Sequence, residues 1–471
     1  MSPGRDAVSG WLAAQRSRLL ADLEALVRIP SVSADPARAA AMREAADWLS
    51  ARLAAIGLQN VRRLAAGGHP AVYADWLQAP AAPTVLVYGH YDVQPPDPLD
   101  RWLSPPFEPT VRDGRLYARG VSDDKGPTLT ALGALEAFLA VEGRLPLNVK
   151  LLLEGEEEVG SRTLSAILAA HPDLLAADVV LSADGARWRP DLATVNVGSR
   201  GIVALELTVR TAAKDLHSGR YGGPVANPLH VMCALIASLH DARGRVAVLG
   251  FSDGVREPSA EDRAMLSAIP FDEAAFFAGL GAAPGAGEAG YSALELNWLR
   301  PTLEVNGMWG GYMGAGSKTV IPCEAHAKIT CRLVAGQDPP TVARAIERHL
   351  QARCPSYAGI SVAYGDHGAA AYALPPGHPA LAAVEAVLAE RRGRQPLRVW
   401  IGGTLPLSAM VLETLGIDTV TFSFSTADED YHAPNEFFRL ASFDEGLTAW
   451  VALLRRLGAL PAAAFAPFRR R

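Results

Sequence analysis

The sequence lacks long apolar runs, paired cysteines and clustered basic residues, and each absence excludes a class of protein. No uninterrupted apolar stretch of ~18 residues occurs, so we expect no membrane span. The four cysteines form no Cys-x-x-Cys pair, which argues against a thiolate zinc site. Lysine and arginine are spread evenly and the net charge is −6, so no nucleic-acid partner is expected.

The N-terminal segment also lacks the pattern of a secreted protein. No apolar run follows the charges in residues 1–6, so we predict no signal peptide. Four thiols without a secretion signal fit a reducing compartment, and a cytoplasmic location is predicted. The 471 residues, 49% of them hydrophobic, suffice for a large core and more than one domain.

The chain is organised around a strand that ends in polar residues. Residues 84–88 are mostly β-branched or aromatic and run into His90 and Asp92. Alternate residues of an extended chain share a face, so both side chains point the same way. A carboxylate beside a histidine commonly orients a metal-binding imidazole. A loop histidine with a capping aspartate is the structural alternative for this pair alone.

Two further predicted strands end in acidic residues. The strand at 148–154 precedes Glu157 and Glu158, and the strand at 179–181 precedes Asp184. Asp123 lies just ahead of a helix opened by Pro127, where negative charge is favoured. Strands alternate with helices here, which predicts an α/β fold with a mainly parallel sheet covered by helices on both faces. Ligands of such sheets gather at the carboxyl ends of the strands.

The pattern of strands alternating with helices changes after residue 200 and resumes near residue 378. We predict a catalytic domain formed by residues 1–200 and 378–471, interrupted by an inserted α+β domain at 201–377. Within the insertion, residues 241–299 are rich in Gly, Ala and Pro and predict loops and short helices. His432 lies in a polar, acidic segment of the returning part.

The collected side chains suit a pair of metal ions. Two imidazoles and three carboxylates fit Zn²⁺, Mn²⁺ or Co²⁺, and five ligands are too many for one tetrahedral ion. A bridging carboxylate would give each of two ions three ligands. Glu157, beside a ligand, could take a proton from water at the site. The five candidate ligands are His90, Asp123, Glu158, Asp184 and His432.

The motifs resemble a family of di-zinc metallopeptidases that includes carnosinase, cytosolic non-specific dipeptidase, carboxypeptidase G and succinyl-diaminopimelate desuccinylase. The resemblance is collinear over nearly the whole chain and best for the dipeptidase branch. The matching motifs are His90-Tyr91-Asp92-Val93-Gln94-Pro95, Asp123-Asp124-Lys125-Gly126-Pro127, Glu157-Glu158, Asp215-Leu216-His217-Ser218-Gly219, Gly316-Ser317-Lys318-Thr319-Val320-Ile321-Pro322 and Arg332-Leu333-Val334.

The resemblance implies a role for each residue of the metal centre. His90 and Asp184 hold one ion, most simply Zn²⁺. Glu158 and His432 hold the other, and Asp123 bridges the two. Asp92 orients His90, and Glu157 acts as general base and then as general acid. The Asp123–Asp124 peptide is expected to be cis.

The resemblance also implies a homodimer formed through the inserted lid domain. His217 would reach the partner subunit's active site and polarise the scissile carbonyl. Arg332 would grip the substrate carboxylate, which suits a guanidinium fork. Thr319, Gly402 and Gly403 would also contact the substrate. By position alone, however, His217 is a surface histidine and Arg332 a paired arginine at the edge of a core.

The sequence departs from the dipeptidase branch at one position. Ile401 stands where a glutamate precedes the Gly-Gly-Ser/Thr turn, which puts a strict preference for free N-termini in doubt. We therefore predict a hydrolase of dipeptides or short peptides with a free C-terminal carboxylate. An N-acyl amino acid amidohydrolase or carboxypeptidase is the alternative, and a catalytically dead metal-binding scaffold is the candidate from another class.

Overall fold

The computed structural model describes residues 7–365 and 368–470, and the chain divides into two compact units. Unit 1 comprises Met1–Val197, Leu374–Val399 and Met410–Arg471, and unit 2 comprises Gly198–Ala373 and Trp400–Ala409. The segment Trp400–Ala409 groups with unit 2, whereas the sequence reading assigned it to the catalytic domain. The functional assignment of the two units stays a prediction, and the residues on which the signal-peptide prediction depends lie outside the described part.

A six-stranded sheet forms the centre of unit 1. Its order is β1-β2-β6-β3-β7-β18. Strands β6, β3, β7 and β18 pair in parallel, and β1 and β2 are antiparallel at one edge. This mixture confirms the predicted α/β fold with a mainly parallel sheet. The strands are β1 (Gln59–Leu64), β2 (Ala71–Trp76), β3 (Thr84–His90), β6 (Asn148–Glu154), β7 (Val179–Ser182) and β18 (Thr419–Thr421).

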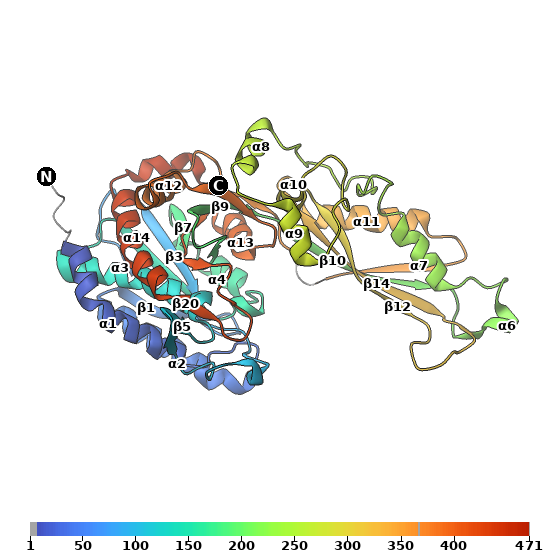
Figure 1. The fold of residues 1–471 in the computed structure, drawn as a ribbon, viewed down its shortest axis with the longest axis horizontal. Helices are drawn as coiled ribbons and strands as arrows, with labels where there is room; N and C mark the ends of the chain where they lie inside the picture. The colour runs from blue at the N-terminus through green and yellow to red at the C-terminus, as the bar shows by residue number, and fades with distance from the viewer. Residues whose placement is uncertain (1–6, 366–367, 471) are drawn as a thin grey trace. The chain divides into compact units, whose positions relative to one another are not determined.

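Long helices pack beside this sheet and hold its central strands away from water. Helix α3 contacts α1, α14 and strand β3, while α2 packs on β1 and β2 (Figure 1). Lys125, just before α3, donates to the carbonyls of Leu26 and Ile29 at the end of α1. The segment that carries Asp123 is thereby fixed to α1. The helices are α1 (Ala7–Val27), α2 (Ala39–Ile56), α3 (Gly126–Glu142), α12 (Pro379–Arg392) and α14 (Leu440–Gly458).

No single helix in residues 7–365 and 368–470 is long and apolar enough to cross a membrane. Helix α14 and the 3₁₀ helix η5 (Ala462–Phe468) meet the length and hydropathy requirements only as a pair, and they are bent by 90° at the break between them. The apolar side chains of α14 are buried in the core of unit 1. Burial of this kind accounts for its hydropathy.

Unit 2 contains a four-stranded antiparallel sheet of order β12-β14-β10-β15. Helices α7 (Pro228–Ala237) and α11 (Pro339–Arg353) cover one face and enclose an apolar core with it. Strands β14 and β15 both pair with β10, so α11 is the crossover of the predicted βαβ-type unit. The strands are β10 (Gly201–Arg210), β12 (Thr302–Gly310), β14 (Glu324–Leu333) and β15 (Gly359–Tyr364).

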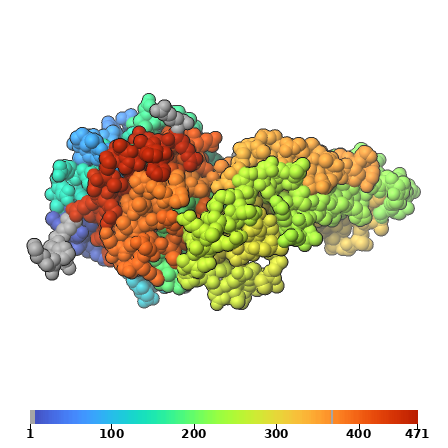
Figure 2. Space-filling view, turned by 90° about the horizontal axis from the view of Figure 1, so that it is seen from above, coloured from blue at the N-terminus to red at the C-terminus, as the bar shows by residue number. Residues whose placement is uncertain are grey.

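Two parts of unit 2 show where local sequence signals were weak. The sequence predicts a strand at 302–305, but β12 continues to Gly310, past an irregularity between Val305 and Gly307. Pairing with β14 overrides the low strand propensity of glycine. The 241–299 segment forms the short helices α8 (Ala260–Ser267), α9 (Glu273–Leu280) and α10 (Ala293–Trp298), as expected. Its yellow-green atoms lie on the surface of unit 2 in Figure 2.

Candidate metal centre

The candidate ligands come from five segments of unit 1, three of them at the carboxyl ends of strands in the central sheet. His90 ends β3, Glu158 lies in a short helical turn after β6, and Asp184 follows β7. Because β3, β6 and β7 are parallel neighbours, their carboxyl ends meet at one edge of the sheet. Asp123 interrupts the helical turn before α3, with φ −124° and ψ 94°, and the Asp123–Asp124 peptide is cis as the resemblance implies.

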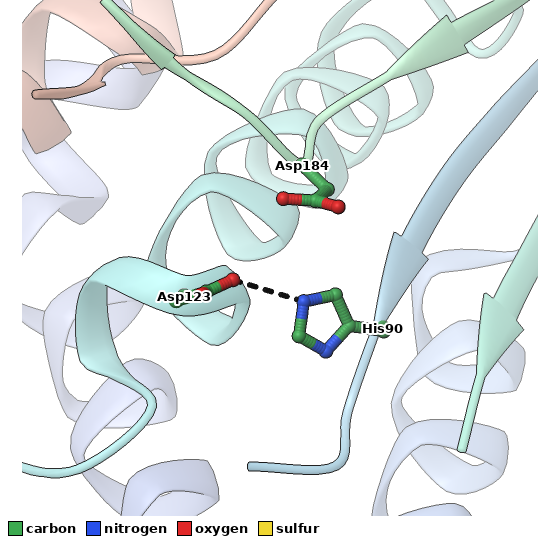
Figure 3. A group of neighbouring side chains, drawn as sticks. All are labelled: His90, Asp123 and Asp184. Atoms are coloured by element: carbon green, nitrogen blue, oxygen red, sulfur yellow. Dashed lines mark hydrogen bonds and ion pairs between the residues drawn. The ribbon is translucent and has the colours of Figure 1, made fainter. Parts of the chain in front are cut away.

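Asp123 lies between the two histidines. Its Oδ1 is 3.0 Å from His90 Nε2, and its Oδ2 is 3.0 Å from His432 Nε2. Glu158 Oε2 lies 3.2 Å from the same His432 nitrogen. Asp184 completes the group around His90, as Figure 3 shows. All five predicted ligands are therefore gathered in unit 1.

These side chains form two overlapping groups, each able to surround one cation. The ligand atoms of each group lie within 4.8 Å of one another. One group is His90, Asp123 and Asp184, and the other is Asp123, Glu158 and His432. Asp123 belongs to both groups and offers a different oxygen to each histidine. That is the arrangement expected of a bridging carboxylate.

Asp92 contacts both His90 and the turn that carries Glu157 and Glu158. It is fully buried, with its Oδ1 3.5 Å and its backbone oxygen 3.1 Å from His90 Nδ1. The backbone N–H groups of Glu157 and Glu158 donate to its two carboxylate oxygens. Ser33 Oγ donates to Oδ2 over 2.7 Å. One carboxylate thus fixes the imidazole and the turn that carries both glutamates.

Sequence reasoning predicted Asp92 but missed two other residues that hold the ligands in place. Buried Glu436 accepts from the backbone N–H groups of Ser122 and Asp123 and from Arg119. Gln94 Nε2 donates to Glu158 Oε2 over 2.8 Å. Both residues occur in or beside segments noticed in the sequence. Nothing local marks them, because their partners lie 64 to 317 positions away.

The backbone of the His432 loop is also held in an uncommon conformation. His432 has a φ of 64°, which for a side chain other than glycine costs ~1 kcal/mol or more. Buried Glu429 accepts from Ser122 Oγ and from the N–H groups of Thr426 and Arg439. These bonds fasten the loop to the segment before Asp123. Strain that is held in this way is typical of functional sites.

The charges of the centre are not balanced by protein groups alone. Burial, together with the negative charges of Asp123 and Glu158, raises the pKa of Asp184 to about 7, although His90 opposes the shift. Hydrogen bonds to Asp123 and Glu158 raise the pKa of His432 to about 10, against the effect of burial. Crowding of buried carboxylates therefore favours the protonated form of Asp184 when no cation is bound. Divalent cations fit such a donor set of imidazoles and carboxylates without thiolates.

The remaining predicted residues lie in unit 2 in two groups. His217 is exposed on the short strand β11 (Leu216–His217), which pairs with β13 (Val320–Ile321) next to Thr319. Arg332 on β14 donates from Nη1 to Thr404 Oγ1 over 2.8 Å, and Thr404 directly follows Gly402 and Gly403 in the sequence. The structure therefore brings His217 close to Thr319, and Arg332 close to the glycine turn.

A mainly parallel α/β sheet with imidazoles and carboxylates at its strand ends defines a metallohydrolase of the exopeptidase type. The sequence model of peptidase family M20/M25/M40 matches residues 86–456. The chain belongs to this family and is a metallopeptidase, which confirms the resemblance noted in the sequence.

Similar proteins include both dipeptidases and a carboxypeptidase. The Cys-Gly metallodipeptidase dug1 of Schizosaccharomyces pombe is 27% identical, over 95% of this chain and 97% of its own length. The human Beta-Ala-His dipeptidase is 29% identical, over 83% and 78%. The structure of the metallo-carboxypeptidase Sso-CP2 from Sulfolobus solfataricus is 31% identical, covers 94% and 99%, and has a TM-score of 0.79.

Proposed function

We propose that the protein hydrolyses dipeptides or short peptides that have a free C-terminal carboxylate, with two divalent cations bound in unit 1. The observation that carries the proposal is the Asp123 carboxylate, whose two oxygens face different histidines. His90 and Asp184 complete one site, and Glu158 and His432 complete the other. Zn²⁺ suits this donor set best, and Mn²⁺ and Co²⁺ are also compatible.

Bound cations would act as Lewis acids that polarise the carbonyl and make water more acidic. Glu157 is suited to the proton transfers, because its carboxylate accepts no hydrogen bond from the described part of the chain. It takes a proton from water as the oxygen adds to the scissile carbonyl carbon. The C–N bond then breaks, and Glu157 returns the proton to the leaving amine. The products are a carboxylate and a free amino acid.

His217 has the tautomer required of a hydrogen-bond donor to the carbonyl. Its Nδ1 accepts from the backbone N–H of Gly219 over 3.0 Å. A neutral imidazole with Nδ1 occupied in this way carries its proton on Nε2. We propose that this N–H donates to the substrate oxygen in the active site of a second copy of the chain. Strand β12 supports a dimer, since it lies at the edge of its sheet and exposes Val305 and Met308.

Two inactive variants are expected to restore each other's activity if His217 acts across a dimer. Glu157→Gln and His217→Ala chains, mixed in equal amounts and allowed to exchange subunits, should regain about a quarter of wild-type activity, because half the dimers are mixed and each has one intact site. The measurement is hydrolysis rate after exchange, with native mass spectrometry to count mixed dimers. Mixed dimers without activity would show that His217 does not act in trans.

A second candidate is hydrolysis of N-acyl amino acids or removal of C-terminal residues. The observation that favours it is Ile401, an apolar side chain directly before the Gly402-Gly403 turn, which cannot pair with a substrate ammonium. The 31% identity to a metallo-carboxypeptidase adds to this. Both candidates share the metal centre and the free carboxylate of the substrate.

A substrate panel separates the two candidates. We expect dipeptides such as Ala-Gly to be cleaved with a kcat/KM at least about tenfold above that of N-acetylated and N-succinylated amino acids. Each substrate is assayed with protein reconstituted with Zn²⁺, Mn²⁺ or Co²⁺. The reverse order of rates would establish the second candidate. A cation-loaded protein that cleaves no member of the panel would leave only the scaffold interpretation.

A further inference from the structure

Arg200 is a buried cation that forms no ion pair with any residue in 7–365 or 368–470. It lies between β9 (Thr194–Ser199) and β10, with 8% of its surface exposed. A buried charge normally has a partner of opposite sign, because desolvation is costly. Here every acceptor is a neutral oxygen. A buried guanidinium of this kind either carries an uncompensated desolvation cost for structural reasons or belongs to a site that binds an anion.

The acceptors of Arg200 come from two separate segments of unit 2. Nε donates to Gly402 O over 2.7 Å, and the backbone N–H is shared between Ile401 O and Gly403 O at 3.2 and 3.0 Å. Nη2 donates to Asn297 Oδ1 over 3.2 Å, at the end of α10. Arg200 therefore binds the glycine turn through three hydrogen bonds from two donors, and fastens the turn to the 241–299 segment.

The turn also touches α10 directly. A Cβ atom on Gly402 would lie 2.5 Å from Asn297 Oδ1, so the Asn297 amide would have to shift to admit a side chain there. On Gly403, by contrast, a Cβ would lie 3.6 Å from Ile401 and meet nothing closer. Asn297 is exposed, so its amide does not serve the core. We interpret its contact with Gly402 as a packing contact that limits where the turn can lie.

The same turn presents donors that the protein leaves unused. The backbone N–H groups of Gly402 and Gly403 donate to no group in the described part of the chain. Arg332 contacts the adjoining Thr404 and, among the described residues, likewise forms no ion pair. Two guanidinium groups and two free N–H groups thus gather around one short turn. A carboxylate is an anion of suitable size and geometry for this set of donors.

We propose that Arg200 is a positioning residue for substrate specificity, clamping the Ile401–Gly403 turn against Asn297 so that its N–H groups and Arg332 bind a substrate carboxylate. The inference rests on the proposed function for the identity of the anion. It assigns to α10, within the 241–299 segment, the role of fixing that turn. Arg200 and Asn297 would thereby contribute to selection of the substrate carboxylate without contacting any reacting atom.

Replacing Arg200 should weaken binding of the carboxylate and leave the chemical step nearly unchanged. For Arg200→Lys, which keeps the charge and loses the fork, we expect KM for Ala-Gly to rise about tenfold with kcat within about twofold. A purely structural role would instead lower the amount of folded enzyme and reduce kcat at constant KM. An unchanged KM in folded Arg200→Lys protein would overturn the proposal.

A double-mutant cycle tests the contact between Gly402 and Asn297 while Arg200 itself is kept, although Asn297→Ala also removes one of the acceptors of Arg200. Gly402→Ala should raise KM by at least about tenfold, because its Cβ meets the Asn297 amide. Asn297→Ala removes that amide, so the double variant should recover to within about threefold of Asn297→Ala alone. Gly403→Ala serves as the matched control, since its Cβ does not meet Asn297 and Asn297→Ala should not rescue it. Failure of the first rescue, or rescue of the control, would contradict the clamp.

Direct binding separates this inference from the proposed function. The catalytically impaired Glu157→Gln chain is titrated calorimetrically with Ala-Gly, N-acetylglycine and the C-terminal amide of each. We expect the acids to bind at least about tenfold tighter than their amides, and Arg200→Lys to remove most of that preference. This result would stand even if the substrate panel showed no turnover. Equal binding of acid and amide would overturn the carboxylate site whatever the enzyme cleaves.

Discussion

Replacing Glu157 by glutamine is expected to lower kcat by about 10³-fold while both cations remain bound. Glutamine preserves the size of the side chain and removes its ability to accept and return a proton. The Glu157 carboxylate accepts no hydrogen bond from the described residues. Burial raises the pKa of Glu157 well above its usual value, and Asp184, Asp123 and Glu158 add to the shift while His90 opposes it.

The measurement pairs steady-state kinetics with metal analysis of the same preparation. Glu156→Gln is the matched control, because this neighbouring carboxylate accepts from Thr163 and belongs to neither candidate cation group. The control should keep kcat within about threefold of wild type. A Glu157→Gln enzyme of normal kcat would assign the proton transfers to another group. Loss of a cation along with activity would show that Glu157 is a ligand rather than a base.

Three of the candidate ligands could be predicted from local signals, because His90, Glu158 and Asp184 each end or follow a strand. A strand ending in His90, acidic residues after two later strands and a parallel sheet place three loops at one edge. The sharing of Asp123 between two cation sites was implied only by the family resemblance. The structure adds the observation that makes sharing physically reasonable, namely two oxygens of one carboxylate facing different histidines.

The supporting residues could not be predicted because their contacts are distant and chemically ordinary. Arg200 binds carbonyl oxygens up to 203 positions away, from residue 200 to residue 403, and no spacing or charge pattern in the sequence indicates such a contact. Glu436 accepts backbone N–H groups more than 300 positions earlier in the chain. The far half of β12 was missed for a related reason, since its glycines form a strand only when β14 is present as a partner. Local patterns therefore identified the chemistry, and tertiary contacts decide how precisely it is held.

The positions of the candidate ligands depend on buried acids that each hold two segments of the chain together. Asp92 fixes His90 and the glutamate turn together, while Glu429 and Glu436 fasten the His432 loop to the segment before Asp123. A substitution in one of these buried acids would move two ligands at once. Supporting residues of this kind typically affect metal affinity by ~10–100-fold. Removal of the shared ligand itself should have a much larger effect.

Replacing Asp123 by asparagine is expected to reduce bound cations from two per chain to one or none and to lower kcat/KM by at least about 10³-fold. Asparagine keeps one oxygen in place but puts an N–H₂ group where the second oxygen faces a histidine. In the protein without cations, burial alone would raise the pKa of Asp123, yet bonds from His432 and His90 lower it. The carboxylate therefore stays ionised and available as a bridge at neutral pH.

Metal content per chain, measured by plasma mass spectrometry after dialysis, is the decisive readout. EDTA should silence the wild-type enzyme, and added Zn²⁺ should restore it, whereas Asp123→Asn should recover little activity at any concentration of Zn²⁺. Asp428→Asn is a suitable control, because this acid lies in the same loop as His432 but pairs with Arg439. Because one carboxylate serves both groups, its loss should affect the two sites together. An Asp123→Asn chain that keeps two cations and full activity would refute the shared-carboxylate centre.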